Sequence, residues 1–198
     1  MENPLEKNLT HIALFAALTL VLFVMPSVML TVGVPISATS LGIMLCGTIL
    51  GSVRGALAAL LFVILVALGV PTMFGGSGGL GLFAGPRAGF LIGFPVAAFV
   101  TGLIVEKWTA PIAPVAFVAA AMGGILALYA IGIPVMAAML SEESLSKMFT
   151  DLPAHRSLSL PLALSALYIP GDLIKCVLAA LITRAVAQMR PGALLSRA

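Results

Sequence analysis

YIPGDLIKCVLAALI, residues 168–182, lies inside an apolar run that extends from about residue 160 to residue 187. It places two charges, Asp172 and Lys175, where a membrane-spanning helix ordinarily carries none. An ionisable residue near the centre of such a helix costs about 2.5–3.5 kcal/mol on insertion scales, so it usually marks a functional site. Because the two residues are three apart, they share one helix face and set an acceptor beside a donor. We therefore expect a membrane protein that recognises a small polar ligand within the bilayer.

The same pair has a structural interpretation, in which Asp172 and Lys175 neutralise each other between helices. In the ligand-binding interpretation, Asp172 accepts a hydrogen bond from a ligand N–H, and Lys175 donates to a carbonyl or carboxylate. Tyr168 precedes Asp172 by four residues on the same face, where it would stack on the ligand or donate its hydroxyl. Further hydroxyl contacts are expected from an upstream loop, at Ser37, Thr39 and Ser40.

The composition of the whole chain agrees with a lipid environment. The 198 residues are 61% hydrophobic and only 9% charged, with a mean hydropathy of +1.20, whereas a soluble domain of this length needs a more charged surface. The net charge of +3 is small and the basic residues are scattered, which gives nucleic-acid binding no support. Cys46 and Cys176 lie far apart in apolar segments, so we expect two buried thiols, no metal site and no cofactor.

Hydropathy predicts an all-α integral membrane protein, a compact bundle of six transmembrane helices forming a single domain over residues 1–198. The first apolar run is expected to be retained as a helix rather than cleaved as a signal peptide. Two predicted helices are shorter than the ~20 residues of a lone span, so they are either buried among neighbours or extend into the flanking loops. Pro134 and the pair Gly123–Gly124 could bend the fifth helix, and Pro170 could kink the sixth. The predicted helices cover residues 11–29, 40–50, 55–69, 89–105, 111–140 and 160–188.

The distribution of basic residues predicts the orientation. With six spans, the side that holds both termini carries Lys7, Arg54, Lys107, Arg184, Arg190 and Arg197. The other side carries Arg87, Lys147 and Arg156, offset by Glu142, Glu143 and Asp151. Because cytoplasmic loops are enriched in Lys and Arg, both termini are expected in the cytoplasm. The longer loops then face outward, over residues 30–39, 70–88 and 141–160.

The loop PTMFGGSGGLGLFAGPRAGF, residues 71–90, is rich in glycine and yet apolar. Glycine lets the backbone approach a ligand closely. We interpret the loop as a lid or wall of the binding site, with contacts at Gly78 and Gly79, while a flexible solvent loop is the alternative. Arg87 at its end offers a forked donor for a ligand carboxylate, or else reaches lipid headgroups.

Two motifs in this loop resemble enzyme signatures. Residues 76–81 match GxGxxG, but a dinucleotide site requires a preceding strand, and here a helix is predicted. Residues 75–78 match the GxSG of intramembrane serine proteases, whose Ser77 would need a histidine nearby. His11 and His155 are not placed for that role. The chain also lacks the GxxxxGK[ST] phosphate-binding loop, so ATP-driven transport would need another subunit.

Ala13 and Ala17 in the first helix form a small-xxx-small pair. Such residues let helices approach closely in lipid. The pair is either a docking face for another membrane subunit or ordinary packing within the chain.

The order of several segments resembles the BioY family, over about residues 13–180. The family comprises biotin-binding S components of energy-coupling factor (ECF) vitamin transporters. Its Gly-rich loop and helix 6 signature match FGGSGGLG and YIPGDLIK here. The other matching segments are GVPIS, LGIMLCG, RGALAALLFVILVALGVP and AGPRAGFLIGFP.

The resemblance implies a six-helix bundle with the vitamin site near the outer face, and biotin recognition by Asp172 and Lys175. It also implies an AxxxA motif at Ala13 and Ala17 that docks on a transmembrane coupling subunit. Two ABC-type ATPases would complete such a transporter. Two positions depart from the pattern of many relatives. Thr39 stands where PITLQT has glutamine, and Arg87 stands where GPTGGY has threonine.

The expectation is therefore a non-enzymatic protein of the bacterial cell membrane that captures biotin from outside and delivers it inward. It would work in lipid with an ECF module or alone, and a homo-oligomer is left open. The alternatives are an S component for another vitamin, an intramembrane protease and a structural membrane subunit.

Overall fold

The computed structural model describes the backbone of residues 4–24, 28–30, 34–70, 79–85, 87–139 and 159–197, and most of their side chains. Residues 71–78 of the Gly-rich loop and 140–158 of the last long loop lie outside the described residues. Gly78, Ser77 and His155 are among them, as are the acidic and basic residues expected between positions 142 and 156. Side chains of residues 159–167 and of the two short strands are likewise outside the description.

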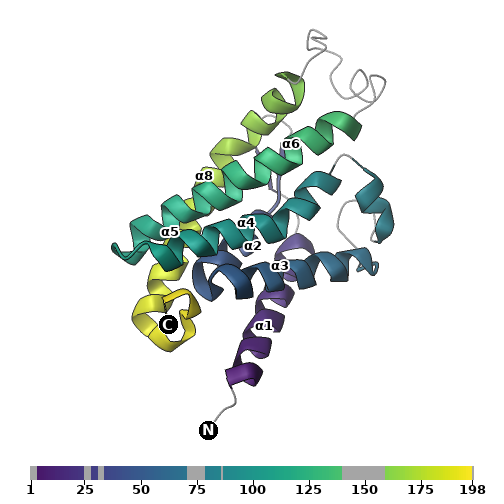
Figure 1. The fold of residues 1–198 in the computed structure, drawn as a ribbon. Coiled ribbons are helices and arrows are strands. Elements are labelled where there is room, and N and C mark those ends of the chain that lie inside the picture. The colour runs from purple at the N-terminus through teal and green to yellow at the C-terminus, as the bar shows by residue number, and fades with distance from the viewer. Residues whose placement is uncertain are drawn as a thin grey trace.

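Helices dominate the described chain (Figure 1). They are α1 (Pro4–Val24), α2 (Thr39–Leu50), α3 (Ser52–Ala67), α4 (Ala88–Lys107), α5 (Ile112–Ala121), α6 (Leu128–Met139) and α8 (Ser159–Met189). A π-helical segment, η2 (Met122–Ala127), joins α5 to α6, so that these three form one continuous rod. The described residues thus form the predicted six helical rods. Short 3-10 turns are η1 (Leu80–Ala84), η3 (Pro191–Ala193) and η4 (Leu195–Arg197).

The end of the first predicted helix is wrong. α1 ends at Val24, and Met29, predicted to be helical, lies in the strand β1 (Val28–Leu30). β1 pairs antiparallel with β2 (Val34–Ile36), Met29 facing Pro35, inside what was expected to be a loop. The reason is that a short apolar run is compatible with either a strand or a helix. Only the presence of a partner strand decides between them.

Arg54 was expected between two helices and instead lies inside α3. The turn from α2 to α3 needs a single residue, Gly51, whose φ of 90° is in the left-handed region that glycine tolerates. The helix therefore resumes at Ser52 without a linker. The carboxylate of Glu106 closes this junction by accepting from the backbone N–H and the hydroxyl of Ser52, each at 2.7 Å.

The central helix is α4, which contacts α2, α3, α5 and α6. It spans 20 residues and 56% of its span is buried, whereas 11% of the span in α1 is buried. Three stretches within the described residues are long and apolar enough to cross a membrane: Leu5–Val24, Ala88–Lys107 and Ile112–Met139. α2 has only 12 residues, and every residue from Gly42 to Leu50 is buried. It is therefore a short helix enclosed by its neighbours, which decides between the two interpretations for this segment.

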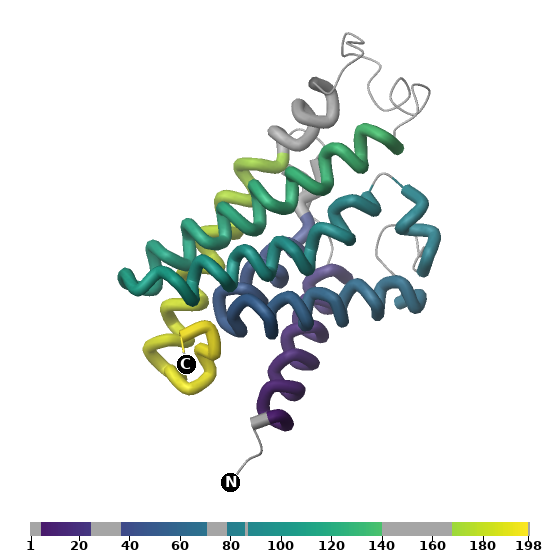
Figure 2. Tube along the Cα trace, viewed as in Figure 1, coloured from purple at the N-terminus to yellow at the C-terminus, as the bar shows by residue number. Residues whose placement is uncertain are grey.

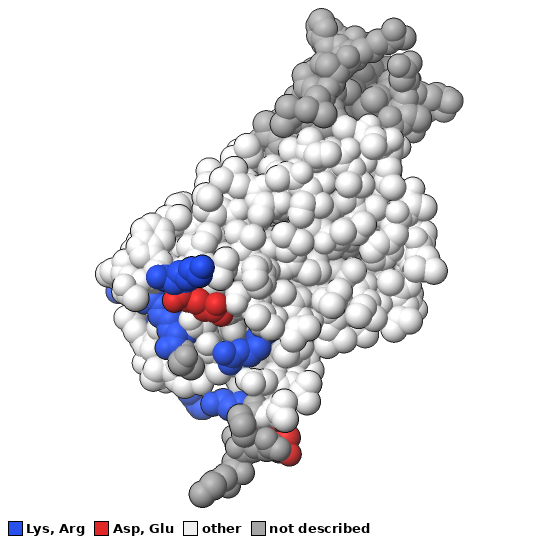
Figure 3. Space-filling model, in the orientation of Figure 1, with Lys and Arg blue, Asp and Glu red and all other residues white. Residues whose placement is uncertain are grey.

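Both termini lie at the same end of the molecule (Figure 2). On the face shown in Figure 3, the Lys and Arg side chains gather at that end. Most of the described surface on the rest of this face carries no charge. The C-terminal segment folds back onto the bundle, where Ser196 is buried and donates to the Thr48 carbonyl at 2.7 Å. Arg54 donates to the Leu195 carbonyl at 3.4 Å and Arg197 to the Trp108 carbonyl at 2.7 Å.

A close contact between helix backbones at Gly102 predicts a large effect of a small substitution. A Cβ at Gly102 of α4 would lie under 3.0 Å from the backbone of Gly51 and Ser52. We expect Gly102→Ala to lower the free energy of unfolding by about 1–3 kcal/mol, which is the usual cost of overpacking a core. Thermal unfolding in detergent measures it, with Gly192→Ala as the control because nothing lies within 4 Å of a Cβ there. Equal stability of the two variants would contradict this packing.

Candidate functional site

Asp172 and Lys175 form an ion pair on the buried face of α8. Their side chains share that face as predicted, with Lys175 Nζ 2.8 Å from Asp172 Oδ1. Only 5% of Asp172 and 8% of Lys175 is exposed. Charges removed from water this far are tolerated only when they are paired and hydrogen-bonded.

Two other helices complete this polar cluster. Ser40, in the first turn of α2, accepts from Lys175 Nζ at 2.8 Å and donates to Asp172 Oδ1 at 3.3 Å. Tyr129, at the start of α6, donates its hydroxyl to Asp172 Oδ2. The Asp172 carboxylate thus has donors on both oxygens, and they come from α2, α6 and its own helix. The cluster carries no net charge and sets hydrogen-bond acceptors beside donors.

Tyr129 is a site residue that the sequence analysis missed. Its ring packs edge-on against Phe90 of α4, with centroids 6.1 Å apart and planes at 90°. A signal was present in the sequence, because Tyr129 is the only residue from Ile112 to Met139 with a side-chain oxygen or nitrogen. What the sequence lacks is any indication that this hydroxyl lies against Asp172, 43 residues further along the chain.

The segment in which hydroxyl contacts were predicted, residues 37–40, leads directly into the cluster at Ser40. Ser37 and Thr39 bond each other, Oγ to Oγ1 at 2.6 Å, at the start of α2. Thr39 is buried and immediately precedes Ser40. Of the three predicted hydroxyls, Ser40 is the one that bonds both members of the ion pair.

The remaining predicted contacts are placed as follows. Tyr168 is 38% exposed. The tyrosine hydroxyl that donates to Asp172 belongs to Tyr129. Arg87 is exposed directly before α4, one turn from Phe90. Gly79 has a φ of 92° and donates its N–H to the Val66 carbonyl at 3.0 Å, which anchors the end of the Gly-rich loop on α3. Gly78 lies outside the described residues.

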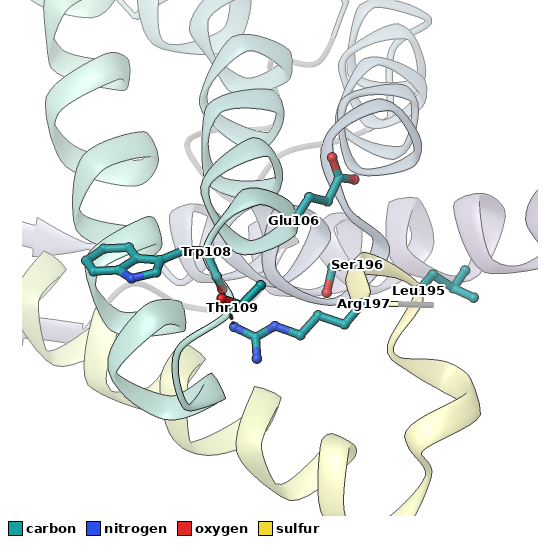
Figure 4. A pocket seen from close by; sticks show the side chains of 6 residues that line it. All are labelled: Glu106, Trp108, Thr109, Leu195, Ser196 and Arg197. Atoms are coloured by element: carbon teal, nitrogen blue, oxygen red, sulfur yellow. Dashed lines mark hydrogen bonds between the residues drawn. The ribbon is translucent and has the colours of Figure 1, made fainter.

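A pocket of about 420 Å³ opens at the end of α4 that lies against the C-terminal segment (Figure 4). Its two charged side chains already have partners, since Glu106 accepts from Ser52 and Arg197 donates to the Trp108 carbonyl. Nothing in it matches the paired charges of the α8 cluster. The lining residues are Glu106, Trp108, Thr109, Leu195, Ser196 and Arg197.

The described residues hold no group of three or more His, Cys, Asp or Glu side chains arranged for a metal ion. Cys46 and Cys176 are free and buried, as predicted. His11 lies on α1, where its Nδ1 is 2.7 Å from the Lys7 carbonyl. The hydrogen-bonding groups of the cluster suit recognition of a polar ligand: a carboxylate for an N–H, and an ammonium and hydroxyls for an oxygen.

Comparison with known proteins places these features in one family. The family model described as the BioY family matches residues 2–192. The biotin transporter BioY of Rhodobacter capsulatus is 50% identical over 98% of this chain and 100% of its own length. The biotin transporter BioY of Rhizobium etli is 42% identical over 91% of this chain and 92% of its own length.

A solved structure is similar over nearly the whole fold. It is the crystal structure of the S-component for biotin from an ECF-type ABC transporter. Its TM-score is 0.76 at 26% sequence identity, and the match covers 96% of this chain and 95% of that one.

The buried ion pair predicts how the ligand-free protein responds to loss of one charge. Lys175→Met leaves the Asp172 carboxylate buried and unpaired, so we expect it to lower the free energy of unfolding by about 3–5 kcal/mol. The double change Asp172→Asn, Lys175→Met should recover most of that loss, because no charge remains buried. Thermal unfolding in detergent measures both, and Lys107→Met, at an exposed lysine, is the control. Unchanged stability of Lys175→Met would contradict a buried pair.

Proposed function

We propose, since this chain belongs to the BioY family, that it is a membrane-embedded biotin-binding S component. It captures biotin from the outer side of the membrane and delivers it inward. The observation that carries this is the buried Asp172–Lys175 pair, completed by Ser40 and Tyr129, in a chain 50% identical to a biotin transporter. The family is one of transporters, so the protease alternative is set aside.

The chemistry of biotin suits the cluster. Its ureido group has two N–H donors and one carbonyl, its fused thioether ring is apolar, and its side chain ends in a carboxylate. Asp172 suits the N–H side, and Lys175 or Arg87 suits an oxygen. The ring and chain suit the apolar helix faces around the cluster. Further contacts are proposed at Tyr168, Ser37, Thr39, Gly78 and Gly79.

The chain is a multi-pass membrane protein, and we propose that both termini are cytoplasmic. The support is the gathering of Lys and Arg at the end that holds the termini (Figure 3), because cytoplasmic segments are enriched in basic residues. The Asp172 cluster is then reached from outside, beneath the Gly-rich loop. We take residues 1–198 as a single domain of the bacterial cell membrane.

The proposed coupling partner binds the outer face of α1. Ala13 and Ala17 are exposed, whereas Ala16 between them is buried at 1% exposure. The small pair is thus not used for packing within the described chain, which supports docking to a transmembrane coupling subunit. ABC-type ATPases would supply the energy, since this sequence has no phosphate-binding loop of its own. Reorientation of the whole bundle on that subunit would carry biotin inward.

Calorimetric titration in detergent tests the substrate. We expect tight binding of biotin and no heat with thiamine or riboflavin. Asp172→Ala and Lys175→Ala should each weaken biotin binding more than tenfold, because a lost charged hydrogen bond costs about 1.5–3 kcal/mol. Binding of another vitamin alone would retain the S-component architecture and discard biotin. Near-normal biotin binding by both variants would contradict the site assignment.

Co-purification with coexpressed coupling and ATPase subunits tests the docking face. Ala13→Leu and Ala17→Leu should remove most of the recovered complex, because a larger side chain prevents close helix approach. Biotin binding by the isolated chain should be unchanged. Ala138→Leu, at an exposed alanine on α6, is the matched control and should keep the complex. Full recovery with both α1 variants would show that the subunits dock elsewhere.

A further inference from the structure

We infer that Tyr129 is a positioning residue for ligand recognition. Its hydroxyl holds the Asp172 carboxylate in one orientation before the ligand arrives, and the π turn just before it sets the direction of the ring. The inference rests on the proposed function, because it concerns the same site. It adds a residue from a helix that carries no other hydrogen-bonding side chain.

An aspartate carboxylate held by a single partner can still rotate about its terminal bond. The terminal torsion of Asp is broad and roughly two-fold, so one partner does not fix the plane of the group. Lys175 and Ser40 both act on Oδ1, at 2.8 and 3.3 Å. Tyr129 is the donor to Oδ2. With both oxygens held by different helices, the carboxylate cannot rotate without breaking a buried hydrogen bond.

The number of donors limits what Asp172 can offer a ligand. An ionised carboxylate has about four acceptor positions. Tyr129, Ser40 and Lys175 occupy three of them. Counting the described residues, about one position remains, so Asp172 is set to accept a single ligand N–H in a defined direction. An orientation fixed in advance saves the ligand the cost of ordering the group.

The direction of Tyr129 depends on the π turn. η2 ends at Ala127, two residues before Tyr129. A π turn contains one residue more than an α turn, and each helical residue rotates the chain by about 100°. Without the extra residue the ring would point away from Asp172 and from Phe90. The turn is held in place because Gly123 packs on Thr101 and Gly124 packs on Met44, where a Cβ would clash.

The test is a double-mutant cycle on biotin affinity. Tyr129→Phe keeps the ring against Phe90 and removes only the hydroxyl. We expect it to weaken biotin binding about tenfold, as loss of a hydrogen bond to a charged group does. In the Asp172→Ala background, which leaves the Tyr129 hydroxyl no acceptor at residue 172, adding Tyr129→Phe should change affinity by less than about twofold, because Tyr129 acts through the carboxylate. A merely structural role would give equal losses in both backgrounds.

Thr183→Val is the matched control. It also removes a buried hydroxyl that bonds across helices, from Thr183 Oγ1 to Thr48 Oγ1 at 2.9 Å, but away from the ion pair. Its biotin affinity should equal that of the wild type. Melting of each ligand-free variant gives its folded fraction. Should Tyr129→Phe fail to fold, Tyr129→Met takes its place in the same cycle, since it also removes the hydroxyl that donates to Asp172 Oδ2 and leaves a flexible apolar side chain.

The outcomes separate this inference from the proposed function. A wild-type protein that does not bind biotin overturns the proposed function. A wild type that binds biotin, with Tyr129→Phe binding within about twofold of it, overturns the positioning role. Equal weakening by Tyr129→Phe in the Asp172→Ala background overturns it as well.

Discussion

Where α4 crosses the junction of α2 and α3, backbone meets backbone with no side chain between them. Gly102 lies against Gly51, and on neighbouring turns Gly47 lies against Thr101 and Gly123 against the opposite side of Thr101. Helices in lipid gain little from the hydrophobic effect, so close approach of this kind is what holds them together. It makes α4 the central helix and encloses the short α2.

The enclosed α2 explains how a polar cluster is built inside an apolar bundle. α2 begins at the level of the α8 charges, which brings Ser40 to Lys175 across 135 residues of sequence. The rod of α5, η2 and α6 brings Tyr129 from the other side. Each partner donates a hydrogen bond to one oxygen of the Asp172 carboxylate, and together these bonds offset the cost of burying two charges. The site is therefore a joint product of three helices, although one helix carries its ionisable groups.

A second polar layer lies further along the same two helices. Thr48 of α2 and Thr183 of α8 bond each other, and Ser196 of the C-terminal segment bonds the Thr48 carbonyl. Between the two layers lies an apolar cluster that includes Met44, Leu45, Cys176 and Ala179. Within the described parts of α2 and α8, these apolar side chains separate the two polar layers. This separation supports the proposed reorientation of the whole bundle over passage of biotin through it.

The sequence by itself determined six apolar helices and a charged pair sharing one face, because hydropathy and helical spacing are local properties. It also singled out Gly123–Gly124 as a place where the long fifth helix could bend, but not that a π-helical segment forms there within a continuous rod. Only the tertiary structure decided that Tyr129 and Ser40 bond Asp172, that β1 pairs with β2, and that the C-terminal segment folds back. These depend on contacts between distant segments, and an isolated hydroxyl or apolar run does not specify its partner.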